Sequence, residues 1–323
     1  MFQYIVRRLA QFVPVFFGVT LMLFMITTVL PGDPVALRAG EKKLPPAVYA
    51  AMRHAYGLDK PWYNQYVDYL GSLAKGDLGT SIASGQEVSE ILSERYMVTV
   101  TLAGGAILLE IIVGLGVGIV AAVKRYSIWD TLATLSTSIL VALPVFWLGI
   151  MLQFFFGIWL KDVTHNAFYL PISGLSGVFP WYAYFILPWV TLASVSTAYA
   201  ARITRSQLLE VSGQDYVRTA HAKGLTDRGV LWGHEMKNAL IPVVTFIGLD
   251  LSAMLSGAIL TENVFNLPGI GWQMVHSIKS YDYPVLFGLV TATLIVVLVV
   301  NLLVDVSYAF LDPRIRYGAA AGE

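Results

Sequence analysis

The stretch LAQFVPVFFGVTLMLFMITTVL, residues 9–30, contains no charged side chain over 22 residues. A helix of that length rises roughly 30 Å, which matches the hydrocarbon thickness of a bilayer. Because lipid offers the backbone no hydrogen-bond partners, the stretch is predicted to be a helix that crosses a membrane. Arg7 and Arg8 precede it as in a signal peptide. However, the run exceeds the roughly 7–15 apolar residues of a cleavable signal and no A-x-A site follows, so we expect it to be retained.

Five further apolar runs of similar length follow along the chain. The six predicted spans are Leu9–Leu30, Val98–Val123, Thr131–Leu160, Trp181–Ala201, Ala239–Thr261 and Val285–Val304. The third run is long, so we expect it to tilt or to break near Pro144. Of the 323 residues, 56% are hydrophobic and only 13% are charged, whereas soluble domains average about 25% charged residues. The predicted fold class is all-α, a polytopic membrane bundle of six transmembrane helices.

Several classes of function find no support in the residues. The net charge is zero and cysteine is absent, which excludes disulfides and thiolate chemistry and gives no indication of a nucleic-acid partner. No G-x-x-x-x-G-K-[ST] motif occurs, so the chain lacks a P-loop. His234-Glu235 begins like H-E-x-x-H, but Asn238 stands at the second ligand position, and catalytic zinc needs three protein ligands. We predict neither metal nor cofactor.

The segment Gly174-Leu175-Ser176-Gly177 fits the G-x-S-G pattern of intramembrane serine proteases. Such an enzyme needs a histidine base at membrane depth, and all five histidines fall outside the predicted spans. Glycine and serine are also common in loops, so the match is poorly specific. We therefore reject a protease function.

Lysine and arginine are distributed unevenly between the two sets of connections. One set contains Arg7, Arg8, Lys124, Arg125, Arg202, Arg205, Arg218, Lys223, Arg228, Lys237, Arg314 and Arg316. The short connections of the other set contain only Lys161 and Lys279, and its long connection exceeds the roughly 60 residues over which the charge rule applies. Because basic connections stay in the cytoplasm, we predict that both termini are cytoplasmic.

That long connection, Pro31–Met97, follows the first predicted helix. Proline and glycine interrupt it, and helical patterns lie between the interruptions at Pro46–Tyr56 and Trp62–Leu73. A connection of this length with its own helices is more than a linker. We predict an ordered extracytoplasmic subdomain.

The most organised polar element is the stretch SGQDYVRTAHAKG, residues 212–224. Ser212 followed by Asp215 has the spacing of a capping box, and Gly224 suits the position after a helix C-terminus, where Lys223 would face the negative end of the helix dipole. The i, i+1, i+4 spacing of Tyr216, Val217 and Ala220 places these three side chains on one face of the predicted helix. A helix this short is marginal alone in water. It is expected either to dock in a groove of another protein or to lie on lipid as an interfacial helix.

Two carboxylic acids fall inside the predicted spans, Glu110 in the second and Asp250 in the fifth. An acidic residue at a helix centre costs roughly 2.5–3.5 kcal/mol on insertion scales, so both should face the bundle interior or a water-filled path. They either line a translocation route or form structural hydrogen bonds between helices. An ion-coupled secondary transporter that uses Asp250 or Glu110 as its protonatable site is an alternative hypothesis.

Residues 210–225, EVSGQDYVRTAHAKGL, resemble the EAA loop of permease subunits in binding-protein-dependent ABC importers. The form is closest to that of dipeptide, oligopeptide, nickel and glutathione permeases. Further matching segments lie in the same order along nearly the whole chain, at 30–35, 57–61, 76–81, 234–244, 260–265, 268–269, 282–284 and 312–316. Such importers contain two different permease subunits, and the chain resembles the B-type subunit of the two.

The resemblance implies a type I importer in the bacterial cytoplasmic membrane, built from two different permeases, two ATPases and an extracytoplasmic solute-binding protein. ATP and Mg²⁺ would be used by the ATPases, so this chain is expected to be a transport subunit and not an enzyme. The implied solute is a dipeptide, an oligopeptide or a related small solute. The implied organisation is 1–95 for the first helix and outer region, 96–311 for the permease domain and 312–323 for a cytoplasmic tail.

The resemblance also implies that the EAA loop forms a coupling helix at about 213–224, which sits in a cleft of an ATPase. The expected coupling residues are Asp215, Tyr216, Arg218, Thr219, Ala220, Ala222, Lys223 and Gly224. Closure of the ATPases on ATP would move this helix and switch the pathway between inward-open and outward-open states. Asp250 and Glu110 are the expected pathway residues.

The chain departs from the general loop at two places. Arg218-Thr219-Ala220 stands where the general motif has Glu-Ala-Ala, and Met236-Lys237 replaces its later Leu-Pro pair. Peptide-type permeases share such departures, so they narrow the subfamily.

Overall fold

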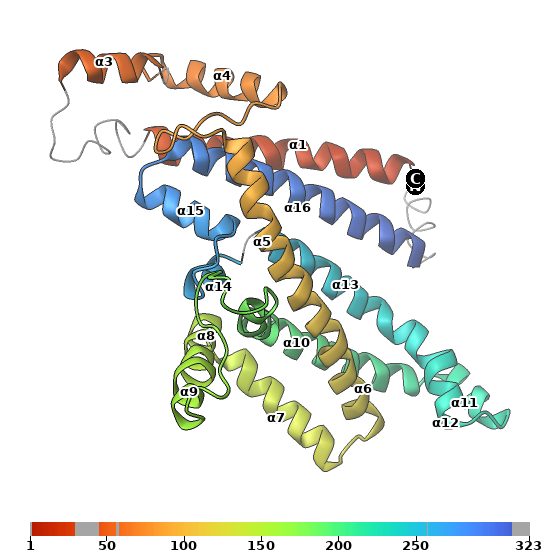
Figure 1. Ribbon diagram of the computed structural model, residues 1–323. Helices are drawn as coiled ribbons and strands as arrows, with labels where there is room; N and C mark the ends of the chain where they lie inside the picture. The colour runs from red at the N-terminus through yellow and green to blue at the C-terminus, as the bar shows by residue number, and fades with distance from the viewer. Residues whose placement is uncertain (1, 30–44, 56–57, 257, 312–323) are drawn as a thin grey trace. The chain divides into compact units, whose positions relative to one another are not determined.

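The computed structural model of the protein describes residues 2–29, 45–55, 58–256 and 258–311. Within those ranges the regular structure is helical, apart from one isolated bridge between Thr80 and Glu87. The N-terminal helices are α1 (Phe2–Phe24), α3 (Pro46–Ala55), α4 (Trp62–Ala74), α5 (Val88–Leu109), α6 (Leu115–Val123), α7 (Ile128–Ala142), α8 (Val145–Leu152) and α9 (Leu160–Val163). The C-terminal ones are α10 (Ala183–Ser212), α11 (Asp215–Ala222), α12 (Asp227–Val230), α13 (Met236–Leu255), α14 (Ile259–Val264), α15 (Ile270–Lys279) and α16 (Tyr283–Leu311) (Figure 1).

Wider π-helical turns continue several of these helices. They are Met25–Val29, Glu110–Gly114, Gln153–Trp159 and Leu231–Glu235. The second of them joins α5 to α6, so that 88–123 is a continuous helical span of 36 residues. Single π-helical turns often mark functional positions, and this one begins at Glu110.

Six helices in the described part of the chain are long and apolar enough to cross a membrane, as the sequence predicts. Their bounds are Ile5–Thr27, Val88–Val123, Val145–Val163, Ala183–Ser212, Asp227–Leu255 and Tyr283–Ser307. The expected break in the third run is confirmed, because α7 ends at Ala142 and Leu143 is extended ahead of Pro144. Proline disfavours a helical conformation in the residue before it, which explains the break.

The prediction of one helix over Ala239–Thr261 is wrong at its C-terminal end. Helix α13 ends at Leu255, where the Ser256 hydroxyl donates to the Ala253 carbonyl at 2.6 Å, and α14 begins separately at Ile259. Serine and the following glycine are poorer helix formers than the apolar residues before them. Hydropathy alone does not register that change.

The helical patterns in the long connection are confirmed by α3 and α4. Residues 30–44, 56–57, 257 and 312–323 lie outside the described part of the chain. The undescribed residues include the matching segments 30–35 and 312–316, part of 57–61, and the predicted tail 312–323.

The chain divides into two compact units, one of residues 99–267 with 300–311 and the other of residues 2–98 with 268–299. In the second unit α5, α15 and α16 share an apolar core. Its buried members are Val88, Ile91, Ile270, Met274, Val285, Leu286 and Leu289. Helix α4 is fastened to this unit by the Tyr69 hydroxyl, which pairs with the Thr291 hydroxyl on α16.

Helix α10 is the centre of the first unit and contacts α6, α7, α8 and α13 (Figure 1). The approach of α6 is close because Gly118 has no side chain. A Cβ atom at Gly118 would lie 2.6 Å from the Ala201 carbonyl oxygen. Small residues allow such helix contacts in membranes, where packing drives association.

Candidate functional site

Helix α11 occupies the position predicted for the docking helix. It follows α10 after only two residues, Gly213 and Gln214, and α12 and α13 come after it. Val217 and Ala220 are buried against Val230 and the partly buried Val211. One face of α11 therefore packs on its own chain, which holds the helix in place without a second protein.

The opposite face of α11 is open. Arg218, Thr219, Ala222 and Lys223 are exposed. Asp215 and Arg218 form an ion pair of 3.4 Å, but their side chains are 95% and 74% exposed, so the pair contributes little stability. This face can therefore contact a partner without breaking a costly internal interaction.

The N-terminus of α11 differs from the capping box that the sequence predicts. Gln214 is the N-cap, with no side-chain cap, and Asp215 lies in the first turn. Ser212 instead ends α10, where its hydroxyl donates to the Leu208 carbonyl at 2.7 Å. Helix α10 runs further than the apolar pattern indicates, so Ser212 is already helical and cannot act as a cap.

The predicted apolar face is also only partly correct. Val217 and Ala220 are buried, but Tyr216 is 41% exposed and its hydroxyl accepts a hydrogen bond from Asn238 Nδ2 at 2.8 Å. An i, i+1 neighbour lies about 100° around a helix, which places Tyr216 at the side of the buried face. There it ties α11 to the beginning of α13.

The C-terminus of α11 is formed as the sequence predicts. Lys223 is the C-cap and Gly224 has φ of +82°, a left-handed conformation that glycine adopts without strain. The Gly224 amide donates to the His221 carbonyl at 2.9 Å and the Leu225 amide to the Ala220 carbonyl at 3.4 Å. These two bonds are those of a Schellman motif, which fixes the exit of the chain.

An apolar cluster joins the adjoining ends of α6, α10 and α13. Its buried members are Ala122 on α6, Leu208 on α10, and Met236 and Ala239 on α13. The same ends of α10 and α13 flank α11 in the chain. Packed side chains therefore connect the two membrane-length helices that precede and follow α11.

The two predicted pathway residues come together in the structure. Glu110 is fully buried and the Asp250 carboxyl lies close enough to interact with it. Neither oxygen of Glu110 has a hydrogen-bond partner of standard geometry among the described residues, and the same holds for Asp250 Oδ2. Burying two acidic groups side by side in an apolar helix bundle is costly, and such groups usually serve a function.

Asp250 also borders a cavity of about 400 Å³ between α8, α10, α13 and α14. Apolar side chains form most of its wall, and Ser196 and Thr261 add hydroxyl groups. Glu110 is absent from this wall. The structure therefore distinguishes the two acids: Asp250 faces open space, and Glu110 lies behind it in the packed bundle.

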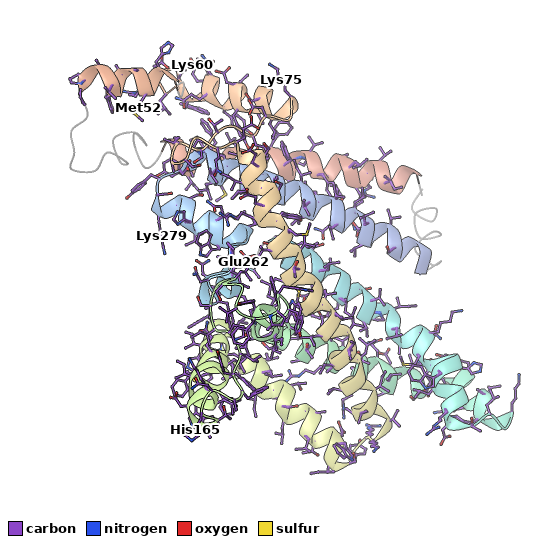
Figure 2. The ribbon with its side chains drawn as sticks, in the orientation of Figure 1. Met52, Lys60, Lys75, His165, Glu262 and Lys279 are labelled. Atoms are coloured by element: carbon purple, nitrogen blue, oxygen red, sulfur yellow. The ribbon has the colours of Figure 1, made fainter. Side chains whose placement is uncertain are left out.

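A third buried acid is Glu262 on α14 (Figure 2). It lies in the segment 260–265 that resembles the permease family, but the sequence predicted no role for it. Its carboxylate accepts a hydrogen bond from the Thr99 hydroxyl at 2.7 Å, and both residues are fully buried. The bond fastens α14, which forms part of the cavity wall, to α5. Glu262 thus supports the wall without facing the cavity.

Sequence reasoning missed an ion pair between α7 and α10. Arg205 Nε donates to Asp130 Oδ1 at 2.7 Å and Arg205 Nη2 to Asp130 Oδ2 at 2.9 Å. The Arg205 guanidinium and the Tyr126 amide lower the pKa of Asp130 to about 2. Arg202, one turn earlier, donates to the hydroxyls of Thr137 and Ser138. The sequence did contain a signal for this contact, because Arg202 and Arg205 are three residues apart and therefore lie on one face of a helix.

The rejected protease motif lies in a loop that has its own structural explanation. The Ser176 hydroxyl pairs with the Tyr184 hydroxyl at 2.8 Å. Gly174 and Gly177 both have positive φ, of 66° and 74°. The glycines therefore serve the turns of the loop, and the serine contacts a tyrosine rather than a histidine.

Two protein-family models together match most of the chain. Residues 114–317 match the model of the binding-protein-dependent transport system inner membrane component, and residues 1–103 match the model of the N-terminal part of such membrane components. The fold is similar to that of a solved chain described as inward-facing conformations of the MetNI methionine ABC transporter. The TM-score is 0.55 at 17% identity, covering 69% of this chain and 97% of that one.

Curated relatives extend over nearly the same length. The dipeptide transport system permease protein DppB of Escherichia coli (strain K12) is 39% identical, over 98% of this chain and 99% of its own. The di/tripeptide transport system permease protein DppB of Pseudomonas aeruginosa (strain UCBPP-PA14) is 38% identical, over 98% and 99%. The oligopeptide transport system permease protein AppB of Bacillus subtilis (strain 168) is 35% identical, over 98% and 100%. The chain thus belongs to the family of inner membrane components of binding-protein-dependent transport systems.

Proposed function

We propose that this multi-pass membrane protein is a permease subunit of an ATP-driven ABC importer and that its solute is a dipeptide or oligopeptide. The observation that carries the proposal is the similarity to peptide permeases over 98% of the chain. The six membrane-length helices agree with it. The ion-coupled alternative receives no support from the family, whose description names a binding protein.

In the proposed importer, this chain pairs with a second permease, and two ATPase subunits and an extracytoplasmic binding protein complete the assembly. ATP hydrolysis belongs to the ATPases, because this sequence contains no P-loop. The permease itself forms and breaks no covalent bond and needs no cofactor of its own. The distribution of lysine and arginine supports cytoplasmic termini, and in that orientation α11 would lie on the side of the ATPases.

Helix α11 is the proposed coupling helix. Its exposed face, with Asp215, Arg218, Thr219 and Lys223, offers charged and polar contacts to an ATPase cleft. Its buried face packs on Val211 of α10 and Val230 of α12, and the Tyr216–Asn238 bond connects it to α13. Motion of an ATPase would shift α11 as a unit, and the packed ends of α10 and α13 would follow.

Asp250 is the proposed pathway residue, and Glu110 supports it from behind. The cavity beside Asp250 is mostly apolar, which suits peptides of varied side chains. A carboxylate at its edge would attract the ammonium end that peptides share. Selection among solutes would then lie mainly with the binding protein.

Reconstitution tests the function directly. The permease pair, the ATPases and the binding protein are placed in liposomes, and uptake of a radiolabelled dipeptide is measured. We expect uptake to require ATP and the binding protein and to persist when the proton gradient is dissipated. Uptake by this chain alone, driven by a proton gradient without ATP, would instead establish the secondary transporter.

A further inference from the structure

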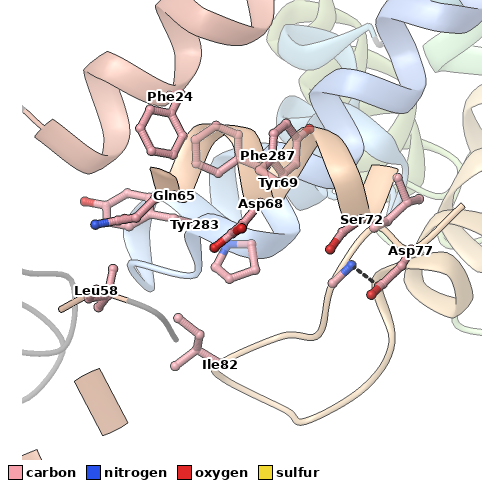
Figure 3. A pocket seen from close by; sticks show the side chains of 13 residues that line it. Phe24, Leu58, Gln65, Asp68, Tyr69, Ser72, Asp77, Ile82, Tyr283 and Phe287 are labelled. Carbon is pink, nitrogen blue, oxygen red and sulfur yellow. Dashed lines mark hydrogen bonds between the residues drawn. The ribbon is translucent and has the colours of Figure 1, made fainter. Parts of the chain in front are cut away.

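A second cavity lies in the unit formed by residues 2–98 and 268–299. Its volume is about 270 Å³, which is at the low end for small-molecule pockets and suits one amino-acid side chain or a small amine. Figure 3 shows the residues around it. They include Phe24, Asp68, Tyr69, Asp77, Gly79 and Phe287.

Aromatic rings form one wall of this cavity. The ring centroid of Phe287 lies 5.8 Å from that of Phe24 and 5.4 Å from that of Tyr69. The Tyr69 hydroxyl is engaged by Thr291, so its ring is held in place. Aromatic rings attract organic cations through their negative faces and also pack against aliphatic stems.

Two carboxylates complete the lining, and none of the lining residues is basic. Asp77 Oδ1 accepts a hydrogen bond from the Gly79 amide at 2.8 Å, which fixes the direction of the carboxylate (Figure 3). Asp68 on α4 also lines the cavity. The cavity therefore combines negative charge with an apolar wall.

Lys60, which precedes α4, already presents an ammonium group to one of these acids. Its Nζ donates to Asp68 Oδ2 at 2.6 Å, with the two side chains 52% and 58% exposed. The hydrogen bond with Asp68 raises the pKa of Lys60 above its ordinary value. Because both side chains are largely in solvent, another ammonium can displace Lys60 at little cost.

We propose that this pocket binds a primary ammonium group on an apolar stem, with Asp68 and Asp77 as acceptors and the rings of Phe24, Tyr69 and Phe287 around the stem. Lys60 competes for Asp68 while the pocket is empty. The site is separate from Asp250 and from α11, so it does not depend on their proposed roles. A lysine side chain of a docked protein and the α-ammonium of a free peptide share this chemistry.

Ligand titration tests the pocket on the full-length chain in lipid nanodiscs. Nα-acetyl-lysine N-methylamide stands for the protein side chain, and alanyl-leucine stands for the free peptide. Binding is followed by saturation-transfer difference NMR. Saturable binding of either probe, absent for its N-acetylated counterpart that lacks the ammonium group, supports the proposal, and the probe that binds more tightly identifies the source. If neither probe shows saturable binding, the proposal is overturned.

Three single variants locate the binding. Asp77→Asn keeps an oxygen acceptor for the Gly79 amide but loses the charge, and should weaken binding up to about fivefold, as for a partly exposed ion pair. Lys60→Gln removes the competitor and should strengthen binding by a similar factor. Asp162→Asn, at an exposed acid that does not line the cavity, should leave the dissociation constant unchanged. Equal dissociation constants for the wild type and the three variants would show that the probe binds elsewhere and would refute the proposed site.

Discussion

The Asp282 carboxylate accepts a hydrogen bond from the Ser81 hydroxyl, 201 residues earlier in the chain. It also accepts bonds from the backbone amides of Ile82 at 3.0 Å and Ala83 at 3.3 Å. Asp282 is 4% exposed and directly precedes α16. One buried side chain thereby holds the loop between α4 and α5 against the beginning of a membrane-length helix.

Asp282→Ala should loosen that loop. The change removes the acceptor of the buried Ser81 hydroxyl and of the Ile82 amide, which costs roughly 1–3 kcal/mol for each buried group left unsatisfied. The Ala83 amide keeps its hydrogen bond to Ser81 Oγ at 3.1 Å. We expect faster cleavage near residues 81–85 in limited proteolysis and a lower melting temperature. Ser89→Ala, at an exposed serine of α5, is the control and should behave as the wild type. Unchanged proteolysis in Asp282→Ala would refute the anchoring role.

Gly118→Ala should separate α6 from α10. The added Cβ would meet the Ala201 carbonyl oxygen at 2.6 Å, and backbone cannot yield cheaply, so a loss of roughly 1–3 kcal/mol is expected. The matched control is Gly116→Ala in the same helix, where the Cβ would have no neighbour within 4 Å. Thermal unfolding in detergent should show a lower midpoint for Gly118→Ala and an equal or higher one for Gly116→Ala. Identical midpoints would contradict the close approach.

The ion pair of Asp130 with Arg205 should make stability depend on pH in acid. The pKa of Asp130 falls from 3.8 to about 2 in the folded protein. A lowered carboxyl pKa contributes stability that is fully present above pH 4 and is lost as the pH falls towards 2. The melting temperature of wild type should exceed that of Asp130→Asn at pH 7, and the difference should shrink between pH 4 and pH 2. A difference that stays constant over that interval would exclude the ion pair as its cause.

Charge reversal on the open face of α11 should uncouple ATP hydrolysis from transport. Arg218 is 74% exposed, so Arg218→Glu should fold and insert normally. Combined with Gly224→Pro, which disrupts the left-handed turn at φ +82°, it should abolish ATP-dependent uptake while the ATPases still hydrolyse ATP. Lys279→Glu, an exposed lysine in the last turn of α15, is the control. Normal coupled uptake in the double variant would argue against docking through α11.

Neutralising Asp250 should slow peptide uptake without disturbing the fold. Asp250→Asn keeps the side-chain shape but removes the negative charge at the cavity edge, so the initial rate should fall by roughly the fivefold to hundredfold typical of one lost charged contact. ATPase activity in the assembled transporter reports whether coupling survives. The exposed Asp162→Asn is the control and should transport normally. If Asp250→Asn transports at the wild-type rate, Asp250 is structural.

The sequence alone determined the helical membrane class, the number of spans and the break at Pro144, because these follow from properties local to each segment. Length, hydropathy and proline chemistry act on neighbouring residues. The same holds for Gly224, whose position after a short helix requires a conformation that glycine favours. The capping box failed because the end of α10 is set by its packing against other helices and not by the residues at Ser212.

Only the tertiary structure decided which polar groups meet. Glu110 and Asp250, Thr99 and Glu262, Asp130 and Arg205, and Ser81 and Asp282 each join distant parts of the chain. Hydropathy indicates that a buried acid needs a partner or a function, but it does not name the partner. That choice depends on which helices pack together, a property of the whole bundle that no single stretch of residues carries.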